Sequence, residues 1–186
     1  LAASFDGHDD PDATAYRRLM TPVTKYWVCK IAPPLVYEAM ECLGGNAYVE
    51  EGGFPLLYRE VPVNAIWEGS GNVMCLDVLR TVERTLERVL PGIEAASGGE
   101  PRLKSAVDGV RILLGEAARD QARARSVVEL LALTAAGALL QAHAPPAVSD
   151  AFLATRLYGA FRHTYGVGLG GGDIHSIAAR AAPSLV

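Results

Sequence analysis

The residue best suited to chemistry in this sequence is Glu68, which follows Trp67 and precedes Gly69. A carboxylate that apolar neighbours partly remove from water has a raised pKa, and such a carboxylate can act as a general base near neutral pH. The run Ile66-Trp67-Glu68-Gly69 therefore predicts a catalytic base in a glycine-rich turn. Two alternatives stay open: a glutamate that is retained but catalytically idle, and an ordinary glutamate in the first turn of a helix.

Helical segments should position this turn. Apolar residues recur every three or four positions from Val73 to Leu90, which predicts an amphipathic helix that begins at Glu68 and ends before Pro91-Gly92. Two helices are expected before the turn. One covers residues 13–30 and bends or restarts at Pro22, and a second begins at Pro33-Pro34 and ends at Gly44-Gly45.

Residues 46–65 contain glycines and prolines without a sustained period, so we predict an ordered surface loop that carries Tyr58 and Arg59. Arg59 is expected to pair with Glu51 or Glu60 or to hold the loop against the domain. Long loops in compact domains are often functional, which makes this segment a candidate part of the site.

The second half of the chain is also predicted to be helical. Residues 91–101 are rich in small residues and indicate a linker, which divides the chain into residues 1–90 and 102–186. A helical stripe begins at Leu103, residues 127–141 are apolar enough to be buried on most sides, and Pro145-Pro146 opens a last helix through about Arg162. The glycine-rich tail, residues 166–175, has no preceding strand, so we expect an irregular end and no phosphate-binding loop. The fold class is therefore all-α.

Composition limits the possible classes of protein. The chain has 186 residues, of which 50% are hydrophobic, and no uninterrupted apolar run of eighteen residues. The first twelve residues are acidic and unlike a signal peptide, so we expect a globular cytoplasmic protein that does not enter a membrane. Cys29, Cys42 and Cys75 are predicted to be reduced core thiols. The four histidines have no ligand spacing, and no metal is expected.

Charge is distributed unevenly. Residues 1–99 carry 8 Lys and Arg against 14 Asp and Glu, a balance of −6, while residues 100–186 carry 9 against 7, a balance of +2. Such asymmetry can mark a half that faces nucleic acid. A surplus of two is nevertheless far below the clustered basic stripe that phosphate binding requires. Arg80, Arg84 and Arg88 are expected to form a solvated face or a subunit contact.

Two motifs at a fixed interval carry a resemblance to a known family. Glu41-Cys42-Leu43-Gly44-Gly45-Asn46-Ala47-Tyr48 precedes Ile66-Trp67-Glu68-Gly69-Ser70, with Leu57-Tyr58-Arg59-Glu60 between them. The separation of Glu41 and Glu68 is 68 − 41 = 27 positions. This arrangement resembles the C-terminal helical domain of flavin-dependent acyl-CoA dehydrogenases, and the Trp-Glu-Gly-Ser-Gly-Asn variant with residues 75–80 is similar to the adaptive-response (AidB-like) branch.

The resemblance implies a role for each matched position. Glu68 would remove the α-proton of an acyl-CoA while the β-hydrogen leaves as hydride to FAD, and Gly69 would lie beside the thioester. Ser70 and Asn72 match positions that contact FAD. The matched segment of the first motif would contact the FAD of a neighbouring subunit, which implies an oligomer, usually a tetramer; its residues are Glu41, Cys42, Leu43, Gly44 and Gly45. An electron-transferring flavoprotein is the implied electron acceptor.

The family's fold is a helical bundle, here with additional C-terminal helices, and the whole enzyme also needs an N-terminal helical domain and a β-barrel domain. The chain is therefore expected to be the C-terminal piece of a longer enzyme and to lack turnover alone. Ala47 replaces a usual glycine and is expected to crowd a turn, Ser70 and Asn72 are shorter than the usual Thr and Gln, and Trp67 should narrow the acyl cavity. The alternative functions are a DNA-associated protective flavoprotein with weak or no dehydrogenase activity, and a helical oligomerisation module.

Overall fold

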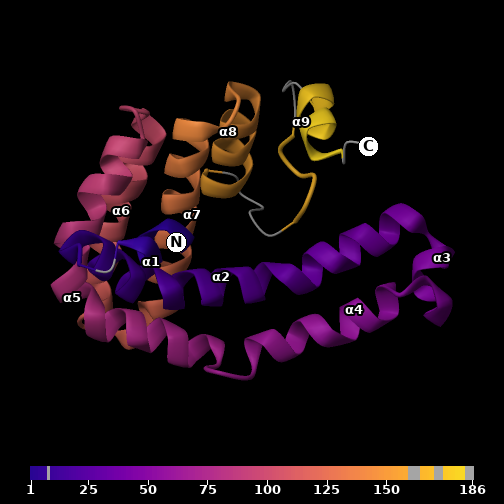
Figure 1. The fold of residues 1–186 in the computed structure, drawn as a ribbon, viewed down its shortest axis with the longest axis horizontal. Helices are drawn as coiled ribbons and strands as arrows, with labels where there is room; N and C mark the ends of the chain where they lie inside the picture. Colours follow the sequence, from indigo (N-terminus) through magenta and orange to yellow (C-terminus); the bar gives the residue numbers. More distant parts are fainter. Residues whose placement is uncertain (8, 159–163, 170–173, 183–186) are drawn as a thin grey trace.

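The computed structural model describes residues 1–7, 9–158, 164–169 and 174–182, and no residue in these ranges lies in a strand. The all-α prediction is confirmed. A long helix, α2, crosses the molecule, and the chain then turns back along it through α4 and α5 (Figure 1). Helices α6 and α7 pack against this pair at the end remote from α3, and α8 lies beside α7. In order, the elements are α1 (Ala2–Asp6), α2 (Pro11–Leu43), α3 (Gly45–Tyr48), η1 (Glu50–Gly52), α4 (Phe54–Glu60), η2 (Val61–Ala65), α5 (Gly71–Ala96), α6 (Pro101–Ala117), η3 (Gln121–Arg123), α7 (Ala124–His143), α8 (Pro146–Phe152), η4 (Leu153–Leu157) and α9 (Ile174–Ala181).

Helix α2 is continuous, so the prediction of two helices that break at Pro33-Pro34 is wrong. A proline inside a helix removes one ladder hydrogen bond, but tertiary packing supplies most of the stability of a helix in a protein. Buried residues such as Val23 and Tyr26 anchor α2 in the core, where it packs on α5 and α7. The predicted end is confirmed, because Gly44 adopts φ 61° and its N–H bonds to the carbonyl of Glu41 at 3.2 Å.

Residues 46–65 form a succession of short helices, α3, η1, α4 and η2, where we predicted an ordered surface loop without helices. Pro55 lies in the first turn of α4, a position that needs no backbone N–H. Arg59 pairs with Glu50 through two hydrogen bonds of 2.9 Å, and not with Glu51 or Glu60. Because this pair joins α4 to η1, Arg59 helps to order the segment.

Helix α5 continues through Pro91-Gly92 to Ala96, so the predicted end before Pro91 is also wrong. Leu90 and Ile93 are both buried, and the helical conformation keeps them on the face that packs into the core. The reversal to α6 takes only residues 97–100, in which Gly98 and Gly99 adopt φ 59° and 80°. Glu100 begins α6 by accepting a hydrogen bond from the backbone N–H of Arg102 at 3.0 Å.

A single cluster of buried apolar side chains extends across α2, α5, α6, α7 and η4. The prediction for residues 127–141 is confirmed, since α7 carries ten buried residues. By length and composition alone, the helical segment 121–143 is apolar enough to cross a membrane, but half of the 18-residue window in it that meets this test is buried inside the protein. Burial against α5 and α6 accounts for its apolar composition. The division of the chain at residues 91–101 stays a prediction.

Two core substitutions test that division. Leu19 of α2 and Leu103 of α6 are fully buried, and both belong to the cluster. Because the cluster includes residues on both sides of 91–101, we expect one cooperative unfolding transition in which Leu19→Ala or Leu103→Ala each lowers the free energy of unfolding by about 2–5 kcal/mol. Denaturant melts followed by circular dichroism measure this effect. Two transitions, each sensitive to one substitution only, would instead establish two domains.

The cysteines differ in exposure. Cys75 is buried and Cys29 is half-buried, whereas Cys42 is exposed, so the prediction of a core thiol is wrong at Cys42 because that residue lies at the exposed end of α2. Burial raises the pKa of the Cys75 thiol to about 11 from an ordinary 9.0. Because only the thiolate reacts, Cys75 should be alkylated by iodoacetamide at pH 8 at least about 100-fold more slowly than Cys42. Mass spectrometry of the labelled peptides checks this, and equal rates would show that Cys75 is accessible.

The C-terminal part contains more helix than predicted. The last predicted helix begins at Pro146 as expected and continues as a turn of π-helix over residues 153–157, and the rest of its predicted range up to Arg162 lies outside the described residues. The tail includes α9, which begins at Ile174, so the prediction of an irregular end is wrong there. Residues 170–173 also lie outside the described part.

Candidate functional site

Glu68 lies in the turn between η2 and α5, one residue before Gly69. Its φ of 52° makes it the one non-glycine residue with positive φ in the described part of the chain, and Gly69 adopts φ 107°. Sparsely populated backbone conformations of this kind persist where surrounding contacts impose them. The glutamate is therefore in a turn that precedes the helix, and the reading of Glu68 as a residue of the first helical turn is wrong.

The side chain of Glu68 is exposed, as are those of Trp67, 58% exposed, and Ile66, 69% exposed. The prediction that these neighbours remove the carboxylate from water is therefore wrong for this chain alone, because the two side chains point into solvent and do not cover it. Exposed large apolar groups beside a carboxylate are a surface that a further domain, subunit or ligand can bury.

Helix α2 holds the turn through two side chains one helical turn apart. Lys25 donates from its Nζ to the carbonyl of Trp67 at 2.9 Å and to the carbonyl of Gly69. Cys29 donates from its Sγ to the carbonyl of Asn64 at 3.1 Å. Residues separated by four lie on the same face of a helix, so one face of α2 binds carbonyls both before and after Glu68.

The N-terminus of α5 completes the site. Gly71 lies close to α2, since a β-carbon on it would be 3.0 Å from Cε of Lys30. Ser70 is the N-cap residue, and its side chain makes no capping hydrogen bond. Asn72 is tied to α7, because Nε of Arg125 donates to its Oδ1 at 2.8 Å. The structure thus brings together four predicted site residues, which are Glu68, Gly69, Ser70 and Asn72.

A cavity of about 620 Å³ lies beside Glu68, between α2 and α5, and its size is within the range of small-molecule sites. Arg18 pairs with Asp77 across it at 2.7 and 2.9 Å, and this hydrogen bonding lowers the pKa of the Asp77 carboxyl. The side of the cavity that α2 forms includes Thr14, Arg17, Arg18, Thr21 and Lys25. Sequence reasoning missed these residues, although their spacing of three and four marks a polar stripe on one face of a helix.

The first motif lies elsewhere. Residues Glu41 to Gly45 are all exposed and lie where α2 meets α3. Lys25, beside Glu68, and Leu43 are 18 residues apart on one helix, which is about 27 Å at 1.5 Å per residue. Figure 1 shows the α3 end of α2 at the far end of the pair of helices, remote from α6 and α7. The two motifs therefore do not form one site within this chain.

The structure also corrects the expectation for Ala47. This residue lies in the short helix α3, is 1% exposed and does not have a positive φ. Its β-carbon therefore does not crowd a turn, because a helical backbone accepts alanine readily.

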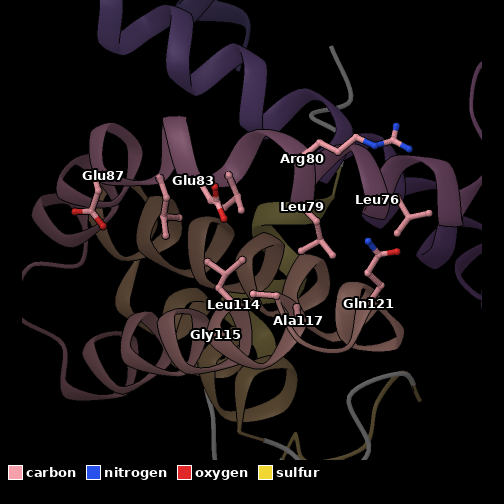
Figure 2. Close-up of a pocket in the computed structure, with 12 residues that line it drawn as sticks. Leu76, Leu79, Arg80, Glu83, Glu87, Leu114, Gly115, Ala117 and Gln121 are labelled. Atoms are coloured by element: carbon pink, nitrogen blue, oxygen red, sulfur yellow. The ribbon is translucent and has the colours of Figure 1, made fainter.

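A second cavity, of about 430 Å³, lies between α5 and α6. Figure 2 shows side chains of α5, among them Leu79 and Glu83, on one side and Leu114 of α6 on the other. Arg80, Glu87 and Gln121 also line this cavity. No predicted site residue lines it, so it is separate from the site at Glu68.

Comparisons with known families and proteins identify relatives of this chain. Residues 2–83 match the family model described as "Acyl-CoA dehydrogenase, C-terminal domain". The chain is 54% identical over 84 residues to the putative acyl-CoA dehydrogenase AidB of Escherichia coli (strain K12), a match that covers 45% of this chain and 16% of that protein. It is 36% identical over 149 residues to acyl-CoA dehydrogenase family member 11 of Caenorhabditis elegans, which covers 68% of this chain and 24% of that protein.

One solved structure extends the likeness to nearly the whole chain. The crystal structure of Caenorhabditis elegans ACDH-11 in complex with C11-CoA matches with a TM-score of 0.69 and 30% sequence identity, and the match covers 97% of this chain and 35% of that one. The similarity thus continues past residue 100. The chain spans about a sixth to a quarter of the length of the two relatives above.

Proposed function

Because residues 2–83 belong to the C-terminal domain of the acyl-CoA dehydrogenase family, we propose that this chain is part of a flavin-dependent acyl-CoA dehydrogenase-like oxidoreductase in which Glu68 is the base. The observation that carries the proposal is the turn at Glu68, where a carboxylate is presented in a constrained backbone conformation beside a cavity of substrate size. A base must be held within reach of the proton that it removes, and a fixed turn provides that positioning.

In the proposed reaction, an oxygen of the Glu68 carboxylate takes the α-proton of the acyl group as the α-carbon–hydrogen bond breaks. We place Gly69 beside the thioester because it is next to the base; the side of Gly69 where a β-carbon would stand is occupied by the end of the Met74 side chain. The exposed Trp67 and Ile66 would be covered in the complete site, and their burial would remove water from the carboxylate. FAD, when bound, supplies the acceptor for the hydride that leaves the β-carbon with its electron pair, so that a double bond forms between the two carbons.

The residues at the N-terminus of α5 are suited to hold a polar edge of such a cofactor. The first N–H groups of a helix lack partners within the helix, and the hydroxyl of Ser70 makes no capping hydrogen bond. Asn72 is oriented by Arg125, which occupies its Oδ1 and leaves its amide NH₂ group to donate. This donor set fits the carbonyl and phosphate oxygens of FAD.

The first motif would serve a different copy of the cofactor. Leu43 of this motif lies about 27 Å along α2 from Lys25, which binds the turn at Glu68, and we therefore assign the motif to a second flavin site. The segment is exposed and includes the exposed Leu43, and further exposed apolar residues lie before and after it in the sequence; they are Leu35, Tyr37, Tyr48, Val49, Leu56 and Leu57. These observations support an oligomer, such as a tetramer, in which the segment contacts the FAD of a neighbouring subunit.

An anaerobic titration tests the proposal. The full-length protein that contains this chain, loaded with FAD, is mixed with short, branched and long acyl-CoAs while the absorbance of the oxidised flavin is followed. We expect at least one class of acyl-CoA to bleach the flavin, which would also identify the substrate class. Bound flavin that no acyl-CoA bleaches would overturn the proposal in favour of a protective or structural role.

The alternative of a DNA-associated flavoprotein gains no support from three of the arginines beyond residue 100. Arg102 pairs with Glu100 and Asp150, and Arg111 and Arg123 each pair with carboxylates of this chain. Their charges are therefore balanced locally and do not gather into a basic stripe. A shift of duplex DNA that weakens steeply with salt would reverse this conclusion.

A further inference from the structure

We propose that Lys25 is a positioning residue for the base: its ammonium group fixes the turn that presents Glu68. The inference rests on the proposed function for its catalytic meaning, but its structural part stands on contacts within the chain. Lys25 donates to the carbonyl of Trp67 at 2.9 Å and to that of Gly69, the residues immediately before and after Glu68.

The turn depends on Lys25 because the backbone N–H groups of the turn itself make few hydrogen bonds. Ile66 and Trp67 donate to the carbonyl of Val63 at 2.9 and 3.1 Å, and the next backbone bond outside the helix ladders, from Met74 to Ser70 at 3.0 Å, already belongs to the start of α5. Between these bonds, the described turn is hydrogen-bonded to the rest of the chain through the carbonyls of Trp67 and Gly69, and Gly69 also packs against the end of Met74. Rotation about the backbone of Glu68 would therefore pull at least one carbonyl away from Lys25.

A lysine is suited to this task. Its ammonium group carries three donors that rotate freely, so it can bind two carbonyls that point in different directions. Lys25 is half-buried at the wall of the cavity that Glu68 also lines, and neither of its two bonds is made to a carboxylate. The positive charge also favours the convergence of two carbonyl dipoles, which would otherwise repel each other.

The test compares Lys25→Met, which removes the donors at similar length, with Lys25→Arg, which restores them. In the full-length FAD-loaded protein, we expect Lys25→Met to lower the rate of flavin reduction about tenfold while the Kd of the acyl-CoA and the FAD content stay within about threefold of wild type. Lys25→Arg should recover most of the rate. Lys104→Met, at an exposed lysine of α6, is the matched control and should leave the rate unchanged.

A second readout separates this proposal from the proposed function. Hydrogen exchange of the amides at residues 67–70, measured without substrate, should be faster in Lys25→Met and return towards wild type in Lys25→Arg. If wild type is not reduced by any acyl-CoA but exchange responds in this way, the proposed function fails and the positioning of the turn stands. Two results would overturn the role of Lys25. One is a Lys25→Met protein in which both amide exchange and the rate of flavin reduction are unchanged. The other is an equal loss of rate in Lys25→Met and Lys25→Arg, accompanied by release of FAD.

Discussion

Replacement of Glu68 by glutamine is expected to lower the rate of flavin reduction by an acyl-CoA about 10³-fold, within the range that a positioned general base contributes. Glutamine has nearly the size and shape of glutamate, so it should occupy the same turn, but its amide does not accept the α-proton. Because Glu68 is exposed and its carboxylate is not a partner in a described ion pair, the substitution should leave the fold and the Kd of the acyl-CoA little changed. Stopped-flow measurement of flavin absorbance under anaerobic conditions gives the rate.

Two variants make this result interpretable. Glu68→Asp keeps a carboxylate but withdraws it by one methylene, so its rate should lie between those of wild type and Glu68→Gln. Glu83→Gln changes an exposed glutamate of α5 that lines the second cavity, and it should reduce the flavin at the wild-type rate. A Glu68→Gln protein that is reduced as fast as wild type would show that another residue is the base.

The periodic parts of the chain were predictable, and the prolines were where prediction failed. Helix α7 follows from its apolar residues alone, because a nearly uniform apolar composition indicates burial on most sides. Pro33-Pro34 was predicted to separate two helices and Pro91 to follow the end of one, yet α2 and α5 continue through them. Local propensity favours a break at proline, whereas packing of the flanking turns into one core outweighs the lost hydrogen bonds. Because that packing joins residues far apart in sequence, local patterns around each proline do not reveal it.

The sequence motif of the candidate site was predictable, but the contacts that hold its turn in place were not. Glu68, Gly69, Ser70 and Asn72 are close in sequence, so their proximity follows from the chain itself. Lys25 is 42 residues from Trp67, and its bond to that carbonyl depends on how α2 lies against the turn. The exposure of Glu68 was missed for a related reason, since sequence neighbours such as Trp67 need not cover the residue beside them.

Gly69 is the position where a single added methyl group should have a large effect. Its φ of 107° is rare for any residue with a side chain and strains alanine there, and a β-carbon would also displace the flexible end of the Met74 side chain. We expect Gly69→Ala to lower the free energy of unfolding by about 1–3 kcal/mol and, by displacing the carboxylate of Glu68, to slow flavin reduction about 10²-fold. Thermal or denaturant melts and stopped-flow reduction measure the two effects.

Gly92→Ala is the matched control, because Gly92 lies inside α5 without a positive φ and a β-carbon on it would meet no atom within 4 Å. Alanine at that position should be neutral or stabilising by up to about 1 kcal/mol, since it has the higher helix propensity. The loss of rate in Gly69→Ala should also persist at temperatures well below its unfolding midpoint, because it arises from a displaced base. A Gly69→Ala protein that is destabilised but reduces its flavin at the wild-type rate would show that the conformation of this turn does not control the chemistry, and would count against Glu68 as the base.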